Sequence, residues 1–315
     1  MSTDASLRRP KYVHPFTDYG FKRLFGETLN KELLMDLINE ILKDETGIIE
    51  DITYMNTERL GPTELDRGAV FDIYCKNQAG EYFIVELQKA KQNYFKERSV
   101  YYATFPIQEQ AQRGNWNFKL KAVYTIGILD FVFDEHKDNP NVMSKVKLCD
   151  LKTNDVFYDK LTFIYLEMPK FNKTEAELES RFDQWLYVFR NLQRLQERPK
   201  KLQERIFNRL FESAEIAKFN TEDLSKYEAS LKHYRDVKNV IDTAWDEGEA
   251  IGLEKGEMIG LEKGREEGRE EGEVIGAKKE QQKTVMRMHE KGMKVEEISD
   301  ILVLPKAEVD AILHP

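Results

Sequence analysis

Three polar residues, Asp72, Glu86 and Gln88, interrupt the largely apolar segment VFDIYCKNQAGEYFIVELQKA, which spans residues 70–90. Residues 78–80 form a short polar connection that contains glycine, so the segment is predicted to fold as a β-hairpin. In the register that this loop sets, Asp72 lies directly opposite Glu86. Gln88 falls on the same face, because side chains alternate along a strand.

Two carboxylates that face each other across a strand pair have Cβ atoms ~5 Å apart and repel each other. Such a pair is costly unless a cation or a shared proton relieves the repulsion. Mg²⁺ binds one or two carboxylates and keeps several waters, which leaves room for a phosphate oxygen and an attacking water. The pattern therefore indicates phosphodiester hydrolysis, with Asp72 and Glu86 as metal ligands and Gln88 orienting the water.

The surroundings of the two acids bear on the alternative, in which both are simply solvated at a sheet edge. Most residues predicted on their face are apolar or aromatic: Val70, Tyr74, Tyr82 and Ile84. The opposite face receives Phe71, Ile73, Cys75, Phe83, Val85 and Leu87. A slip of one residue would mix the two sets. We therefore expect the acids to lie in a covered cleft.

The elements that must position this hairpin follow from apolar spacing and helix caps. Helices are predicted at residues 18–25, 30–42, 93–113, 178–195, 202–211 and 221–245. Strands are predicted at residues 48–55, 70–76, 81–88, 122–129, 142–149 and 161–168. We expect an α/β domain at residues 10–170, followed by a helical region at residues 171–246.

A glycine recurs at every fourth position from Gly248 to Gly276, in an otherwise helix-forming and acidic stretch. On a helix these glycines would form a slowly winding stripe. Each costs about 1 kcal/mol relative to alanine in an exposed helix. The stripe could offset this cost by close contact with a second helix, or residues 247–280 could be a flexible charged arm. The first alternative implies self-association through this arm.

The tail, residues 281–315, is predicted to form three short helices separated near Gly292 and Pro305, an arrangement similar to a helix-turn-helix. Its last helix carries Lys306 but also Glu308 and Asp310. These two acids make the helix poorly suited to enter a DNA groove, because the DNA backbone is negatively charged. A packing or assembly role is the alternative to DNA reading.

Composition restricts the remaining possibilities. The chain of 315 residues has 41% hydrophobic and 33% charged residues, and no window is apolar enough for a membrane span. Its first residues contain no stretch of signal-peptide type, its two cysteines cannot form a disulfide framework, and its five histidines lack zinc-ligand spacing. We expect a cytoplasmic protein with no membrane partner. The net charge of −9 does not favour a polyanionic partner, but residues 89–121 hold seven basic residues against two acids.

The chain resembles the PD-(D/E)XK nuclease superfamily, and within it the recombination-promoting nuclease (Rpn) family, also known as a transposase family. The resemblance runs through the segments HPFTDYGFKRLFGE, NKELLMDLINEIL, DRGAVFDIYCKNQAGEYFIVELQKAKQNYFKERSVYYATFPIQEQ and AVYTIGILDF, and continues through the helical half, the glycine repeat and the tail. It implies a restriction-endonuclease-like mixed sheet flanked by helices. It also implies a DNA endonuclease that depends on Mg²⁺, Mn²⁺ or Ca²⁺ and serves recombination or transposition.

By position, Asp72 and Glu86 match the two metal-binding acids of the superfamily, whereas Gln88 stands where the wider superfamily has lysine. Glutamine supplies no positive charge to a transition state. Lys89 would alternate onto the apolar face if the strand continued, which makes it a poor substitute. Lys96, on the following helix, is a second candidate for this role.

Other residues match the family near the site. Asp18 matches a motif acid and is either a third ligand, an acceptor behind the ligands, or a helix N-terminal acid that pairs with Lys22 four residues later. Arg98, Tyr101 and Tyr102 would contact the DNA backbone, although at least one tyrosine is expected to fill the core.

Two classes of function therefore remain open. The first is a metal-dependent DNA endonuclease of recombination or transposition, which the sequence does not separate from a phage-defence nuclease. The second is a catalytically weak or inactive protein of nuclease fold that acts as a DNA-binding or assembly factor. The second reading is motivated by Gln88, the acidic net charge and the glycine repeat.

Overall fold

The computed structural model describes residues 10–59, 68–111 and 114–314. Two compact units are present, Met1–Ile241 and Asp242–Pro315. The first unit contains the predicted α/β domain and also most of the predicted helical region. Arg113, the expected end of one helix, lies outside the described residues.

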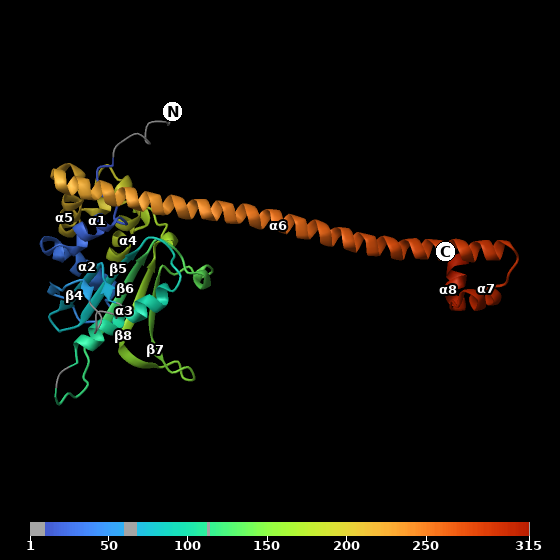
Figure 1. Cartoon of the computed structure of the whole chain (residues 1–315), viewed down its shortest axis with the longest axis horizontal. Helices are drawn as coiled ribbons and strands as arrows, with labels where there is room; N and C mark the ends of the chain where they lie inside the picture. Colours follow the sequence, from blue (N-terminus) through green and yellow to red (C-terminus); the bar gives the residue numbers. More distant parts are fainter. Residues whose placement is uncertain (1–9, 60–67, 112–113, 315) are drawn as a thin grey trace. The chain divides into compact units, whose positions relative to one another are not determined.

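A mixed sheet of six strands forms the centre of the first unit, in the order β1-β4-β5-β6-β8-β7 (Figure 1). Its strands are β1 Ile52–Tyr54, β4 Ile73–Asn77, β5 Tyr82–Gln88, β6 Val123–Leu129, β8 Val156–Glu167 and β7 Met143–Cys149. The pairs β5–β6 and β6–β8 are parallel, and the other three pairs are antiparallel. Every residue of β5 and β6 is buried. The near-continuous apolar sequence of these strands is therefore explained by cover on both faces.

Helices cover the two faces of this sheet. On one face Phe83 and Val85 belong to the same core as Leu37 of α2 and Trp185 of α4. On the other face Tyr82 and Ile84 pack with Phe95 of α3. The helices of this unit are α1 Asp18–Phe21, continued by a π-helical turn Lys22–Gly26, α2 Lys31–Ile41, α3 Phe95–Glu109, α4 Arg181–Asn191, α5 Arg205–Ala214 and the start of α6 Thr221–Glu290. Short 3₁₀ turns lie at Thr28–Asn30, Asp134–His136, Met168–Lys170, Glu175–Glu177, Leu192–Arg194, Lys200–Leu202 and Ile216–Lys218.

The hairpin of β4 and β5 has the predicted register. Ile73 pairs with Val85 and Lys76 pairs with Tyr82. Gly80 has φ +82°, the left-handed conformation that a three-residue hairpin loop requires. The loop chemistry and the alternation of apolar residues therefore determine this pairing.

The prediction of one continuous strand at residues 70–76 was wrong. The chain bends at residues 71–72, and a separate strand β3, Ala69–Val70, pairs with β2, Glu58–Arg59. The amide of Phe71 donates to the carbonyl of Thr57 at 2.9 Å. Consequently Val70 does not face Gln88, and Phe71 lies in the core on the α3 face instead of the opposite one.

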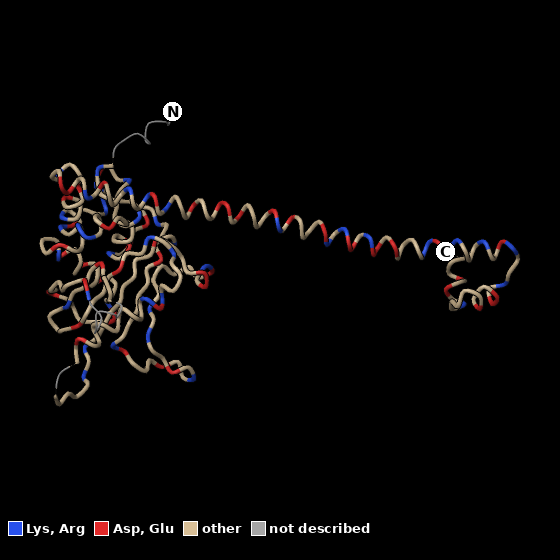
Figure 2. The backbone as a smooth tube through the Cα atoms, viewed as in Figure 1, with Lys and Arg blue, Asp and Glu red and all other residues tan. Residues whose placement is uncertain are grey.

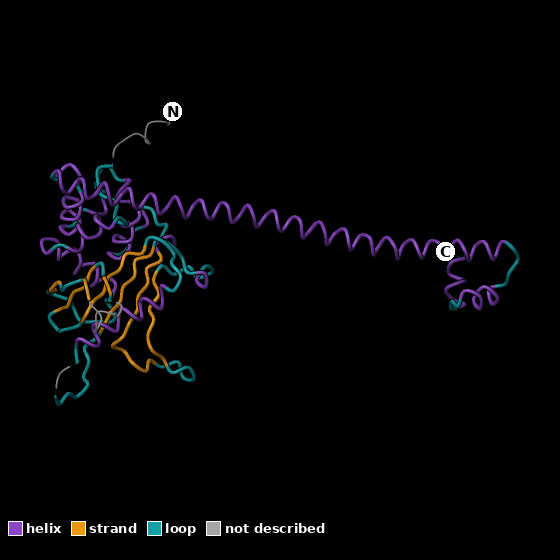
Figure 3. The backbone as a smooth tube through the Cα atoms, viewed as in Figure 1, coloured by secondary structure: helices purple, strands orange, loops and turns teal. Residues whose placement is uncertain are grey.

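The second unit contains the rest of α6, followed by α7 Val295–Leu302 and α8 Lys306–Leu313. Charges of both signs alternate along α6 (Figure 2), and the glycine repeat is helical without a break (Figure 3). A Cβ atom added at any of the eight repeat glycines would meet, within 4 Å, no heavy atom of the described residues beyond the neighbouring backbone of α6 itself. Val285, Ile298 and Val309 form a small core between the three helices. No helix among the described residues is long and apolar enough to cross a membrane.

Candidate active site

Asp72 and Glu86 lie together where β4 begins and β5 ends. The amide of Asp72 donates to Oε1 of Glu86 at 3.2 Å, and the amide of Leu87 donates to Oδ2 of Asp72 at 2.7 Å. Each carboxylate is therefore fixed by a backbone amide at or beside the other acid. The side chains that the sequence predicts to face each other are adjacent in the structure.

Burial makes this carboxylate pair costly. Glu86 is only 9% exposed, and its burial, followed by the negative charge of Asp72, raises its pKa to about 8. Burial also raises the pKa of Asp72, although the Leu87 amide and the positive charge of Lys22 act in the opposite direction. A bound cation would relieve both the burial cost and the mutual repulsion.

Gln88 is held by the protein at both ends of its amide group. Its Nε2 donates to the carbonyl of Ala90 at 2.8 Å, and its Oε1 accepts from the guanidinium of Arg98 at 2.5 Å. Arg98 also donates to Gln92 at 2.5 Å, and its positive charge lowers the pKa of Glu86. Gln88 thus holds the guanidinium of Arg98 near the acids. The position of Gln88 in the strand pattern does not indicate this role.

Lys89 directly follows β5 and lies within electrostatic range of Asp72. Strand β5 ends at Gln88, so the alternation that would place Lys89 on the apolar face stops one residue earlier. Burial lowers the pKa of Lys89, while the negative charges of Asp18 and Asp72 favour its protonated form. The condition on which the sequence analysis set Lys89 aside, a strand that continues beyond Gln88, is therefore not met, and a role for Lys89 in the site stays a prediction.

Asp18 and Lys22 form the expected pair on α1 and its π-helical continuation. Their side chains are joined by an ion pair of 3.0 Å and are about half exposed. The positive charge of Lys22 lowers the pKa of both Asp72 and Glu86, so Lys22 lies within electrostatic range of both acids. Among the described residues there is no group of three or more Asp, Glu, His or Cys side chains that could hold a metal. Asp18 therefore does not complete a third ligand position in this geometry.

The remaining candidates lie on or near α3. The ammonium of Lys96 forms an ion pair with Glu135 and lies over the ring of Phe133, so it does not reach the acids. Tyr101 is 40% exposed on the outer side of the helix. Tyr102 packs edge-on against Phe71 with ring centroids 5.3 Å apart, as expected for a tyrosine that fills the core.

The donor set fits a hard divalent cation with few protein ligands. Oδ1 of Asp72 and Oε2 of Glu86 form no hydrogen bond with the residues that the structure describes. Two carboxylates with one free oxygen each suit Mg²⁺, which takes one or two protein carboxylates and keeps its other positions for water and phosphate.

A mixed sheet with helices on both faces and two acids on its central hairpin is consistent with the PD-(D/E)XK nuclease fold. The family model of the PD-(D/E)XK nuclease family transposases matches residues 15–244, and the chain belongs to this family. No curated protein and no solved structure matches the chain. The matched range ends within α6 and includes every residue of the site described above.

Proposed function

We propose that the protein is a divalent-metal-dependent DNA endonuclease that acts in recombination or transposition. The observation that carries this proposal is the buried pair Asp72 and Glu86, each held by one backbone amide and each with one oxygen that no described residue hydrogen-bonds. Two adjacent buried acids are stable at neutral pH only with a proton or a cation between them. Membership of a nuclease family supports a catalytic metal site as the reason why the protein buries two adjacent carboxylates.

In the proposed reaction a water attacks the phosphorus, one phosphorus–oxygen ester bond breaks, and the products are a phosphate monoester and a hydroxyl. A divalent ion at the acids would supply Lewis-acid stabilisation of the phosphate and lower the pKa of the attacking water. The chain itself supplies two carboxylates to hold that ion. The backbone amides of Asp72 and Leu87 keep those carboxylates from turning away.

Lys89 is the proposed replacement for the superfamily lysine, whose position is occupied here by Gln88. It is half-buried and lies in the electrostatic field of Asp72. A lysine ammonium beside the site can stabilise the negative charge that develops on the phosphate. Arg98 is fixed through Gln88 and adds a second cation that does not have to move during the reaction.

A plasmid-nicking assay tests the proposal. We expect cleavage by the wild type with Mg²⁺ or Mn²⁺, and a loss of more than about a hundredfold in Asp72→Asn, the upper range for groups that support a metal. The asparagine keeps an acceptor for the Leu87 amide, so the fold is retained. Asp138→Asn, at an exposed position, is the matched control. Equal nicking by both variants would overturn the proposal.

The alternative is a protein of nuclease fold that binds DNA or assembles without cutting it. It is favoured by the absence of lysine at position 88 and by the apolar residues exposed along the glycine repeat, such as Leu253, Ile259 and Leu261. It predicts DNA binding without cleavage in any divalent metal. It also predicts self-association that is lost when residues 247–280 are deleted, which sedimentation of the two proteins would measure.

A further inference from the structure

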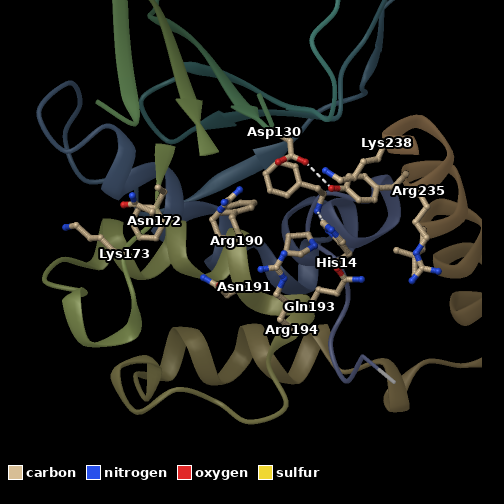
Figure 4. Close-up of a pocket in the computed structure, with 16 residues that line it drawn as sticks. His14, Asp130, Asn172, Lys173, Arg190, Asn191, Gln193, Arg194, Arg235 and Lys238 are labelled. Carbon is tan, nitrogen blue, oxygen red and sulfur yellow. Dashed lines mark hydrogen bonds between the residues drawn. The ribbon is translucent and has the colours of Figure 1, made fainter. Parts of the chain in front are cut away.

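A basic pocket of about 530 Å³ lies in the first unit, beside the end of the central strands. Figure 4 shows charged and amide side chains from five segments of the chain around this space, one of which carries Asn172 and Lys173. His14 comes from the segment before α1, and Asp130 follows β6. Arg190 and Arg194 come from the end of α4 and the turn after it, and Arg235 and Lys238 come from α6.

Most positive charges of this pocket are not neutralised by the described part of the chain. A fifth cation, Lys173, is paired with Asp183 at 2.9 Å. By contrast, Arg190, Arg194, Arg235 and Lys238 form no ion pair within the part of the chain that the structure describes. Asp130 is the one carboxylate among the described lining residues, and its Oδ2 accepts from the hydroxyl of Tyr234 at 3.0 Å. Four unpaired cations against one occupied carboxylate give the pocket a positive potential that favours an anion from outside.

His14 adds a neutral hydrogen-bond donor. Burial, followed by the charges of Arg194, Arg235 and Lys238, lowers the pKa of His14 to about 4. Its Nδ1 accepts from the amide of Phe16 at 3.1 Å, so the proton of the neutral ring is on Nε2. Nε2 has no hydrogen-bond partner among the described residues. Guanidinium groups and an imidazole N–H together match the oxygen-rich, negatively charged surface of phosphate groups.

The pocket and the acids share one edge of the sheet. Strands β5 and β6 are parallel, so both end at this edge. The amide of Asp130 donates to the carbonyl of Gln88 at 2.9 Å, which joins the pocket wall to the strand that carries Glu86. Lys89 acts electrostatically on both His14 and Asp72, so it lies within electrostatic range of both sites. In sheets with parallel strands, this carboxyl-terminal edge is where ligands bind.

We propose that this pocket is a phosphate-binding subsite for the DNA backbone, which holds the strand next to the bond at Asp72 and Glu86. The inference rests on the proposed nuclease function for the identity of the ligand. The four unpaired cations are exposed and come from two separate segments of the chain, the end of α4 with its following turn, and α6. A row of phosphates along a strand can engage such a spread of charges, whereas a single small anion would reach only part of it.

The test measures binding of fluorescently labelled single- and double-stranded DNA by the full chain in a chelator, so that no cleavage occurs. We expect Arg194→Gln/Arg235→Gln to bind about tenfold or more weakly, and the slope of log affinity against log salt to fall by about 1.4–1.8 for two lost contacts. Lys152→Gln/Lys200→Gln removes the same charge from exposed positions outside the pocket. This control should bind within about twofold of wild type, because exposed distant charges are screened.

Equal affinity of the pocket and control variants for DNA would overturn the proposal. A second result would also overturn it. In that case calorimetry shows that the wild type binds inorganic phosphate or pyrophosphate and that the pocket variant does not, while the two proteins bind DNA with the same affinity. Asp72→Asn separates this inference from the nuclease function. Weaker DNA binding in the pocket variant, with no cleavage by the wild type, would keep the subsite and reject the nuclease. Loss of cleavage in Asp72→Asn, with unchanged DNA binding in the pocket variant, would keep the nuclease function and reject the subsite.

Discussion

Asp72 and Glu86 are connected through the backbone as well as through space, because the amide of Asp72 donates to the carboxylate of Glu86 and the amide after Glu86 donates to the carboxylate of Asp72. The two acids therefore keep their separation before any metal binds. Such preorganisation is what a metal site needs, since no rearrangement has to accompany binding. Its cost is the burial of two like charges, which raises the pKa of both groups.

A metal that relieves this repulsion should stabilise the folded protein. We expect Mn²⁺ or Mg²⁺ to raise the melting temperature of the wild type, with about 2.7 kcal/mol of stabilisation at a hundredfold excess over Kd. Glu86→Gln should abolish most of this response, because it removes one of two ligands. Glu50→Gln, an exposed acid away from the site, is the control. A full metal response in Glu86→Gln would exclude Glu86 as a ligand. Thermal melts with and without metal give the answer without any activity measurement.

Lys89 should act on the rate of cleavage and not on metal binding. Lys89→Met is expected to slow cleavage by about 10²–10³, the effect of removing one group that stabilises developing negative charge. Lys89→Arg should recover part of the rate, and Lys91→Met, which disrupts the surface pair with Asp134, should change little. Single-turnover rates at saturating metal measure this. An unchanged rate in Lys89→Met would remove Lys89 from the mechanism.

Restoring the lysine of the wider superfamily at position 88 should not improve this protein. Gln88→Lys would place an ammonium where Oε1 now accepts from Arg98, and a lysine cannot accept that bond. We expect a loss of about 1–3 kcal/mol in the free energy of unfolding, as for an unsatisfied charged partner. Adding Arg98→Gln to the same chain should recover stability, which a double-mutant cycle of urea unfolding measures. Independent effects of the two changes would contradict the link between Gln88 and Arg98.

Acid should weaken the first unit through His14. The pKa of His14 is lowered from 6.5 to about 4 in the folded protein, so the unfolded chain binds the extra proton more readily. The stability that the neutral ring provides is complete above pH 6.5 and falls as the pH drops toward 4, by at most about 1.4 kcal/mol per pH unit. His14→Asn keeps an acceptor for the Phe16 amide but does not titrate. Urea unfolding across this range should show a shallower decline for the variant, and parallel curves would refute the assignment.

Replacing glycines of the α6 repeat by alanine should have opposite effects if α6 is a lone helix and if it pairs with a second copy. Alanine at Gly256, Gly260 and Gly264 would bring its Cβ within 4 Å of no other part of the described chain, so a lone helix should gain about 1 kcal/mol per substitution. Hydrogen exchange of residues 247–280 in the full chain would then show stronger protection. If the stripe is instead a contact between copies, the same substitutions should reduce self-association and protection together.

The sequence determined the parts of this protein that depend on neighbours along the chain. The polar loop before β5 and the alternation of apolar residues set the hairpin register, and that register placed Asp72 beside Glu86. The pairing of Asp18 with Lys22 likewise follows from a spacing of four residues on a helix.

Only the tertiary structure decided what depends on where strands stop and on which distant segments meet. Alternation gave the wrong side for Phe71 because the chain bends to pair with β2, and it does not apply to Lys89 because β5 ends one residue before it. The basic pocket brings His14, Arg194 and Arg235 together from positions far apart in the chain, at an edge created by parallel strands. Periodicity carries information about one face of one element, whereas a site between elements exists only after long-range packing has fixed their separation.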